Sequence, residues 1–227
     1  MNPADNARAR SAILARLREA APADTGTAPG VAAYYGRLAT PERSSIATRF
    51  AERARSWRAE VVDCTAHNWA EALARIVAAK GIRHLLAGRT TPLAAGIAAL
   101  APATSLHWYD ETMETFKPVL FDQIDAGIST TRGGIADTGS LIVWPDADEP
   151  RTLSLVPPIH IAVLHAHTLH ETLYAAMQAQ RWAGQLPTNA LLVTGPSKTA
   201  DIQRLLVYGA HGPKQLVILL LHGEAGA

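Results

Sequence analysis

A glycine-containing segment with three polar side chains is the first candidate for a site. The segment contains Gly195, Ser197, Lys198 and Thr199. It follows an apolar run at 190–194 and precedes residues 200–208, which we expect to form a helix. The free N–H groups and the positive dipole end at the start of a helix attract anions, so these four residues are candidate ligands of a carboxylate or phosphate. Ser197 or Thr199 could equally cap the helix, with Asp201 in its first turn, and the two interpretations are compatible.

Two other polar segments are candidates to line the same site. Asp137, Thr138 and Gly139 lie consecutively in a glycine-rich stretch, and His211 precedes the last apolar run. Asp137 and His211 are the candidate catalytic residues, as proton donors or acceptors, and Thr138 and Gly139 are candidate ligand-binding residues. An aspartate next to glycine also commonly forms a turn, which is the structural alternative for Asp137.

Several familiar motifs are incomplete in this sequence. The segment around Lys198 lacks the two glycines of a Walker phosphate loop. His170 and Glu171 begin like a zinc-protease helix, but Tyr174 stands where the second histidine is required. The sequence contains neither the G-x-G-x-x-G of dinucleotide-binding folds nor the G-x-S-x-G of α/β-hydrolases. The common dehydrogenase and hydrolase assignments therefore have no local support.

Composition limits the cofactors and partners. The 227 residues are 48% hydrophobic and 18% charged, which is enough for one well-filled core. The 21 Lys and Arg residues against 20 Asp and Glu residues give a formal charge of +1, which argues against electrostatically driven nucleic-acid binding.

The cysteine and histidine residues predict no metal centre in this chain. Cys64 is the single cysteine, so the chain cannot supply the thiolates of an iron–sulfur cluster, and any such cluster must belong to a partner. His165, His167 and His170 are close in sequence, but we interpret them as ordinary polar residues at a strand end and a helix start. We therefore expect no cofactor in this chain.

The sequence contains no export or membrane signal that we can identify. Residues 1–20 have no apolar core of a signal peptide, and the longest apolar run, 216–221, has the length of a strand. We therefore expect a protein of a reducing compartment, the cytoplasm, with no membrane span.

Alternation of helical and strand patterns predicts the architecture. Residues 4–20 have a helical pattern and residues 21–36 have none, so residues 1–39 are expected to form an N-terminal helical arm and linker. In the remainder, 40–227, helices are expected at 41–57 and at 69–79, where Gly81 ends the second of them. Strands are expected at 60–64, 83–88 and 105–109, with a short helix after Pro92.

The second half repeats the alternation. Strands are expected at 159–165, 190–194 and 215–221, and helices at 171–183 and 200–208. The glycine-rich stretch 128–144 lacks a helical period and predicts short, antiparallel strands and turns. Together these patterns predict one α/β domain with a largely parallel sheet, helices on both faces and a glycine-rich antiparallel insertion. The central sheet is expected to include 83–88, 159–165, 190–194 and 215–221. At its carboxyl edge, Asp137, Thr138 and Gly139 are expected to meet the segment 195–199 and His211 in one cleft.

Four segments, in the same order and spacing, resemble a known family. They are 134–141 (GIADTGSL), 154–163 (SLVPPIHIAV), 194–202 (TGPSKTADI) and 209–213 (GAHGP). These strings resemble the LUD domain of the lactate utilization protein C (LutC) family, and the resemblance covers roughly residues 40–222. Two positions depart from the family pattern, because Asp137 stands where glutamate is common and Arg132 where an acidic residue is common.

The resemblance implies a fold of the NagB/RpiA/CoA-transferase type. It also implies a role with iron–sulfur partner subunits in the oxidation of L-lactate to pyruvate, in which this chain is the cluster-free subunit and binds a small anionic ligand. Related folds leave two alternatives open. One is a stand-alone enzyme with ATP-dependent ligase chemistry or with a CoA or phosphate ligand, and the other is a regulatory or assembly module. A stand-alone enzyme should bind its own phosphate-bearing ligand, and copurification with cysteine-rich partners discriminates the regulatory or assembly module.

Overall fold

The chain forms two compact units, which are described separately. The computed structural model describes residues 3–20, 30–37, 43–100, 104–200 and 206–223. Unit one comprises residues 1–39 and unit two residues 40–227. Unit one contains α1 (Pro3–Glu19) and α2 (Val31–Tyr35). Ile13 and Leu17 of α1 are 59% and 63% exposed, so this unit has no core of its own in the described residues.

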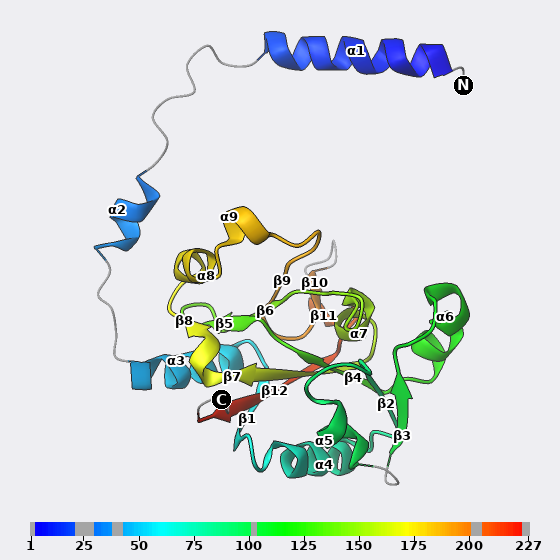
Figure 1. Cartoon of the computed structure of the whole chain (residues 1–227), viewed down its shortest axis with the longest axis vertical. Helices are drawn as coiled ribbons and strands as arrows, with labels where there is room; N and C mark the ends of the chain where they lie inside the picture. The colour runs from blue at the N-terminus through cyan, green and yellow to red at the C-terminus, as the bar shows by residue number, and fades with distance from the viewer. Residues whose placement is uncertain (1–2, 21–29, 38–42, 101–103, 201–205, 224–227) are drawn as a thin grey trace. The chain divides into compact units, whose positions relative to one another are not determined.

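A six-stranded sheet forms the centre of unit two (Figure 1). Its strands, in spatial order, are β1 (Glu60–Thr65), β12 (Gln215–His222), β7 (Ile159–His165), β4 (Ala126–Thr130), β2 (His84–Ala87) and β3 (Ser105–Trp108). All five strand pairs are parallel. Residues 216–221 are buried without alternation, because both faces of β12 are covered by other elements. The predicted α/β class with a largely parallel sheet is confirmed.

Helices α4 (Trp69–Lys80) and α5 (Ala94–Ala98) cover one face of this sheet. Leu73 and Ile76 of α4 belong to one buried cluster with Ile161 and Val217 of the sheet. Helix α4 ends, as its sequence predicts, at Gly81, whose φ of 64° is left-handed and whose N–H bonds the carbonyl of Ala78. Burial of this apolar stripe is therefore what holds α4 on the sheet.

The other face carries α3 (Arg43–Ser56) and a second, smaller sheet. The small sheet contains, in spatial order, β8 (Leu169–His170), β5 (Gly133–Ile135), β6 (Ser140–Val143) and β9 (Leu191–Val193). Strands β5 and β6 are antiparallel, as the glycine-rich stretch predicts. The prediction that residues 190–194 belong to the central sheet is wrong. Strand β9 lies at the edge of the small sheet, antiparallel to β6, and Leu192 is 46% exposed.

Shorter elements complete unit two. They are α6 (Met113–Asp122), α7 (Arg151–Leu155), the 3₁₀ turn Ala166–Thr168, α8 (Leu173–Ala179) and α9 (Trp182–Gln185). The single helix predicted for 171–183 is interrupted, because Arg181 has a left-handed φ of 52°. Trp182 is thereby buried and donates its indole N–H to the Gln180 side chain. None of the described helices combines the length and apolarity needed to cross a membrane.

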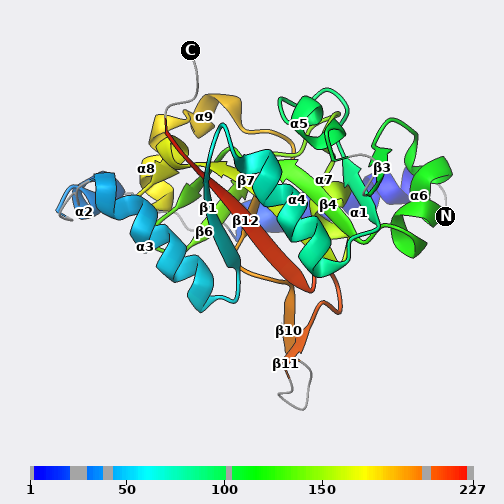
Figure 2. The same ribbon diagram turned by 90° about the horizontal axis from the view of Figure 1, so that it is seen from below.

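A two-stranded hairpin replaces the helix predicted for 200–208. Its strands are β10 (Lys198–Ala200) and β11 (Leu206–Tyr208), paired antiparallel, and Asp201 between them lies outside the described residues. Figure 2 shows this hairpin projecting from the body of unit two. The Ser197 N–H donates to the Pro213 carbonyl, and the Gly209 N–H donates to the Ser197 carbonyl. These bonds hold the two described ends of the segment, Lys198–Ala200 and Leu206–Tyr208, side by side as strands. The proposed helix N-terminus and its capping by Ser197 or Thr199 are therefore wrong.

Candidate functional site

A cleft of about 350 Å³ lies at the amino edge of the central sheet. We call it the amino-edge cleft. It is lined by Ser154, Leu155, His160, Leu192, Val193, Thr194, Gly195, Pro196, Ser197, His211, Gly212, Pro213 and Leu216. The segment 211–213 directly precedes β12, and 154–155 ends the helix before β7, so the cleft lies where these two strands begin. The expectation of a cleft at the carboxyl edge is corrected, because β9 does not belong to the central sheet.

His160 is the fully buried polar residue of this cleft. It lies on β7, where its Nε2 atom is 2.9 Å from Ser129 Oγ, and its Nδ1 atom has no hydrogen-bond partner among the described residues. Burial lowers the pKa of His160 to about 4, so its imidazole is neutral at neutral pH. His160 is not among the site residues predicted from the sequence. The available signal was a histidine inside the otherwise apolar strand 159–164.

The glycines of the cleft permit close backbone packing. Gly195 has a φ of 75°, and a Cβ atom there would lie 2.2 Å from the Trp57 carbonyl oxygen. A Cβ atom on Gly212 would lie 3.0 Å from the Ser197 Cβ atom. The segments 194–197 and 211–213 can therefore approach the end of α3 and one another only because these positions have no side chain.

A chain of hydroxyl groups connects the two predicted site segments. Thr138 Oγ1 lies 2.8 Å from Ser140 Oγ, which lies 2.6 Å from Thr194 Oγ1. Gly139 packs on the end of α3, where its Cβ would lie 2.4 Å from the Ala54 nitrogen. Thr138 and Gly139 therefore position the segment that enters the cleft. They do not themselves line it.

Removal of the central hydroxyl tests this connection. Ser140→Ala is expected to lower the free energy of unfolding by about 1–2 kcal/mol, because it leaves the Thr194 hydroxyl without this partner. Urea denaturation measures the change. Thr138 is the exposed end of this row of hydroxyl groups, so Thr138→Val should lower the free energy of unfolding by less than Ser140→Ala does. If Ser140→Ala lowers the free energy of unfolding by less than about 0.5 kcal/mol, the hydrogen bonds between these hydroxyl groups have no structural role.

Asp137 and Thr199 lie outside the cleft. Asp137 is exposed in the turn 136–139 between β5 and β6, in agreement with the turn interpretation. Thr199 is paired with Val207 in the hairpin. The structure therefore brings together Gly195, Ser197 and His211 in the cleft, whereas the other candidates do not line it.

Basic residues border two smaller clefts at the base of the hairpin, on the other side of Pro196. One, of about 300 Å³, includes Arg58, Lys198 and Tyr208, and the other, of about 190 Å³, includes Arg58, Tyr208 and Lys214. The Arg58 guanidinium lies over the Tyr208 ring, 4.5 Å from its centre, and Arg58 has a positive φ of 66°. Arg58, Lys198 and Lys214 therefore form what we call the basic surface. Of these three residues, only Lys198 was predicted from the sequence as a site residue.

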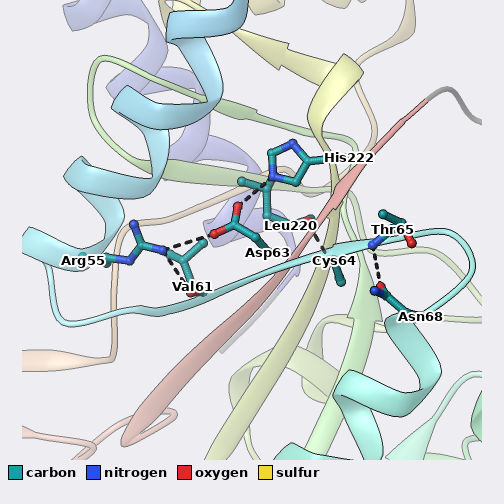
Figure 3. Close-up of polar contacts among 8 residues, drawn as sticks. All are labelled: Arg55, Val61, Asp63, Cys64, Thr65, Asn68, Leu220 and His222. Carbon is teal, nitrogen blue, oxygen red and sulfur yellow. Dashed lines mark hydrogen bonds and ion pairs between the residues drawn. The ribbon is translucent and has the colours of Figure 1, made fainter.

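The carboxyl edge of the sheet carries a separate polar group (Figure 3). The imidazole of His222, at the end of β12, lies 2.7 Å from the Asp63 carboxylate, and Arg55 approaches the same carboxylate at 3.5 Å. These side chains are exposed, so their ion pairs contribute little stability. The buried Cys64 thiol lies 3.6 Å from the Leu220 carbonyl oxygen. Burial, followed by the charge of Asp63, raises the pKa of Cys64 to about 11, so the thiol is protonated and unreactive at neutral pH.

The histidines considered as metal ligands do not form such a site. The rings of His165 and His167 lie 5.3 Å apart, and burial followed by the charge of His167 lowers the pKa of His165. The ring of His170 lies 3.4 Å from the Gln180 side-chain nitrogen. Within the described residues, no three His, Cys, Asp or Glu side chains are grouped to hold a metal ion.

These features define an α/β protein with a parallel central sheet and an inserted small sheet. A cleft of ligand size is lined by residues of both sheets and of the base of the hairpin. A crystal structure of a DUF162 family protein from Deinococcus radiodurans has the same fold, with a TM-score of 0.60 and 19% identity over 81% of this chain and 100% of that one. The model of the LUD domain family matches residues 47–221. The chain belongs to the LUD domain family.

Relatives of this chain include proteins with and without a functional name. An uncharacterized protein of Neisseria meningitidis serogroup B is 35% identical over 94% of this chain and 93% of that one. Lactate utilization protein C of Macrococcus caseolyticus is 27% identical over 68% of each chain. Lactate utilization protein C of Oceanobacillus iheyensis is 30% identical, and this chain spans about half of its length, 54%.

Proposed function

We propose that this protein is the cluster-free component of an L-lactate utilization system in the cytoplasm, where it acts with iron–sulfur partner subunits in the oxidation of L-lactate to pyruvate. The observation that carries the proposal is the similarity to several proteins named lactate utilization protein C, within one matched LUD domain. The amino-edge cleft and the adjoining basic surface supply a place where a small organic anion can bind.

The cysteine content supports the division of labour. Iron–sulfur clusters are held by several thiolates, and this chain contributes only the buried Cys64. Electrons from lactate therefore pass to clusters in other subunits, and this chain contributes ligand binding. Ser197, His211 and the backbone at Gly195 would hold the ligand from inside the cleft, and Lys198 would attract its negative charge from the adjoining basic surface.

Growth of a deletion strain tests the pathway. Loss of the gene is expected to prevent growth on L-lactate as sole carbon source, and the wild-type chain should restore it. The purified chain should not show the visible absorbance of an iron–sulfur cluster. It should oxidise lactate only after its cysteine-rich partners are added. Normal growth of the deletion strain, or lactate oxidation by the isolated chain, would refute the proposal.

Point variants test the residues in the same strain. Lys198→Ala and Asp137→Asn are expected to abolish growth on L-lactate, because Lys198 lines a cleft at the hairpin base and Asp137 precedes the Thr138 hydroxyl that connects through Ser140 to Thr194. Lys117→Ala and Asp122→Asn make the same changes at exposed positions of α6 and should support normal growth. Equal growth of all four variants would reduce Lys198 and Asp137 to structural residues.

The basic surface favours one second candidate, a stand-alone enzyme with a phosphate-bearing ligand. Arg58, Lys198 and Lys214 border the two hairpin-base clefts, and the acidic residue there, Glu60, already pairs with Lys80. Calorimetric titration with ATP and with L-lactate distinguishes the two functions. Tight ATP binding that Arg58→Ala weakens would favour the enzyme.

A further inference from the structure

One face of the projecting hairpin combines basic and apolar side chains. Lys198 pairs with Tyr208 across the hairpin, and Leu206 lies two positions before Tyr208, so the three side chains share a face. Leu206 is 54% exposed. Trp57, directly after α3, is 49% exposed and lines the cleft of about 300 Å³ together with Lys198 and Tyr208. Large apolar side chains that are exposed close together mark sites of contact with other proteins.

The three cations of the basic surface have no acidic partner within the described part of the chain. Arg58, Lys198 and Lys214 are exposed, and none of them belongs to an ion pair there. Glu60, which lines the smaller cleft, is paired with Lys80 instead. The positive charge is therefore not balanced locally, and it attracts a partner that carries carboxylates.

Arg58 occupies a backbone position that favours glycine. Its φ of 66° is left-handed, and the N–H of the next residue, Ala59, donates to the Ala54 carbonyl. A bond of this span is usual where a helix ends at a left-handed glycine. Arginine is strained in this conformation, and strained residues gather where a side chain has a function. The guanidinium lies over the Tyr208 ring, on the hairpin face described above.

The extent of this surface favours an extended peptide as its occupant. The two clefts at the hairpin base share Arg58, Pro196 and Tyr208, so they adjoin, and Leu206 lies outside both of them. Each strand of the hairpin also has one edge without a neighbouring strand among the residues that the structure describes. Such an edge offers backbone N–H and C=O groups to an added strand, whereas a small anion would use neither the edge nor Leu206.

Single-stranded nucleic acid fits the same surface less well. Its bases bind by stacking on open aromatic rings. One side of the Tyr208 ring is already covered by Arg58, and Leu206 has no ring on which a base could stack. The observations therefore favour a protein partner with acidic and apolar side chains.

Resting on the proposed function, we propose that an extended, acidic segment of the iron–sulfur partner subunit binds as an added strand to this face of the hairpin. We call the face the docking surface, and it comprises Trp57, Arg58, Lys198, Leu206, Tyr208 and Lys214. Alternate residues of a strand face the same side, so acidic side chains of the segment meet the cations, and apolar side chains two positions away meet Leu206 and Trp57. The amino-edge cleft, on the other side of Pro196, remains open to a small ligand.

Selection of peptides from a random display library on the purified full-length chain tests the proposal. The selected peptides are expected to carry Asp or Glu two positions away from an aliphatic or aromatic residue. A synthetic peptide of this kind should bind at least about tenfold more tightly than the same peptide with Asn and Gln in place of Asp and Glu, because the amides lose the charge-assisted contacts. A single-stranded oligonucleotide is titrated in parallel.

Paired variants locate the contact. Trp57→Ala and Arg58→Gly should each weaken peptide binding at least about tenfold, whereas Phe121→Ala and Arg75→Ala, which remove an exposed aromatic ring of α6 and an exposed cation of α4, should leave it unchanged. Thermal unfolding verifies that the variants fold, and Leu206→Ser repeats the test within the hairpin. Arg58→Gly should unfold at the wild-type temperature or above it, because glycine relieves the strained φ.

Copurification of the cysteine-rich partner should likewise be lost with Trp57→Ala and kept with Phe121→Ala. The inference would be overturned if no acidic peptide is selected, if Trp57→Ala binds peptide and partner as Phe121→Ala does, or if the oligonucleotide binds to the same residues more tightly than the peptide. A lower unfolding temperature for Arg58→Gly would show that the arginine serves the fold, which also contradicts the inference. Peptide binding as expected, combined with normal growth of the deletion strain on lactate, would refute the proposed pathway and leave the docking surface standing.

Discussion

Gly195→Ala is expected to lower the free energy of unfolding by about 2–5 kcal/mol, one of the largest effects of any single methyl group in this chain. Two costs add. A left-handed φ of 75° is strained for alanine, and the new Cβ would lie 2.2 Å from the Trp57 carbonyl oxygen, which is backbone and cannot rotate away. Denaturant unfolding measures the loss. The cleft should also lose ligand affinity, because the segment 194–197 must move away from α3.

Two other glycines serve as matched controls. Gly81 has a left-handed φ of 64°, but no atom lies within 4 Å of its Cβ position, so Gly81→Ala should show the conformational cost alone, about 1–2 kcal/mol. Gly184, an exposed residue of α9, has neither strain nor a neighbour within 4 Å of its Cβ position, and Gly184→Ala should be neutral or stabilising by up to about 1 kcal/mol. If Gly195→Ala costs no more than Gly81→Ala, close packing on Trp57 is not what requires glycine.

The protein is expected to lose stability on acidification because of His160. Its pKa is about 4 in the folded chain and 6.5 when unfolded, since burial disfavours the charged ring. Above pH 6.5 both states are neutral at this residue, so the folded state bears no penalty. As the pH falls from 6.5 towards 4, the unfolded chain takes up a proton that the folded chain refuses. The loss from this residue is on the order of 3 kcal/mol.

The free energy of unfolding, measured across that pH range, checks this expectation. His160→Gln cannot titrate at this position, so the difference between the wild-type and variant curves isolates His160. Burial also lowers the pKa of His107 and His165, which adds to acid destabilisation, and raises the pKa of Glu149, which opposes it. These three groups are present in both proteins and cancel in the difference. Parallel curves for the two proteins would contradict a strongly depressed pKa.

Two elements differ from the sequence prediction for different physical reasons. The helix predicted for 200–208 is wrong at its described ends, because Ala200 pairs with Leu206 in an antiparallel ladder and this tertiary pairing outweighs local helical propensity. Strand 190–194 was assigned to the wrong sheet because an apolar run indicates burial and does not indicate which strand it pairs with. The cleft consequently lies at the opposite edge from the predicted one.

By itself, the sequence determined the class of fold and several of its elements. Continuous apolar runs at 161–164 and 216–221 favour a sheet covered on both faces, and Gly81 ends its helix by a purely local backbone preference. The resemblance of four short segments to the LUD family likewise lies in the order of residues along the chain, and the family assignment agrees with it.

Only the tertiary structure decided which residues form the cleft. The hydroxyls of Ser140 and Thr194 are 54 positions apart in sequence and 2.6 Å apart in space. His160 is an ordinary strand residue in the sequence. In the structure it is a buried imidazole that contacts Ser129 through Nε2 and whose Nδ1 atom has no hydrogen-bond partner among the described residues. Local patterns specify period and burial, whereas the environment of a side chain depends on contacts between segments whose pairing no local pattern encodes.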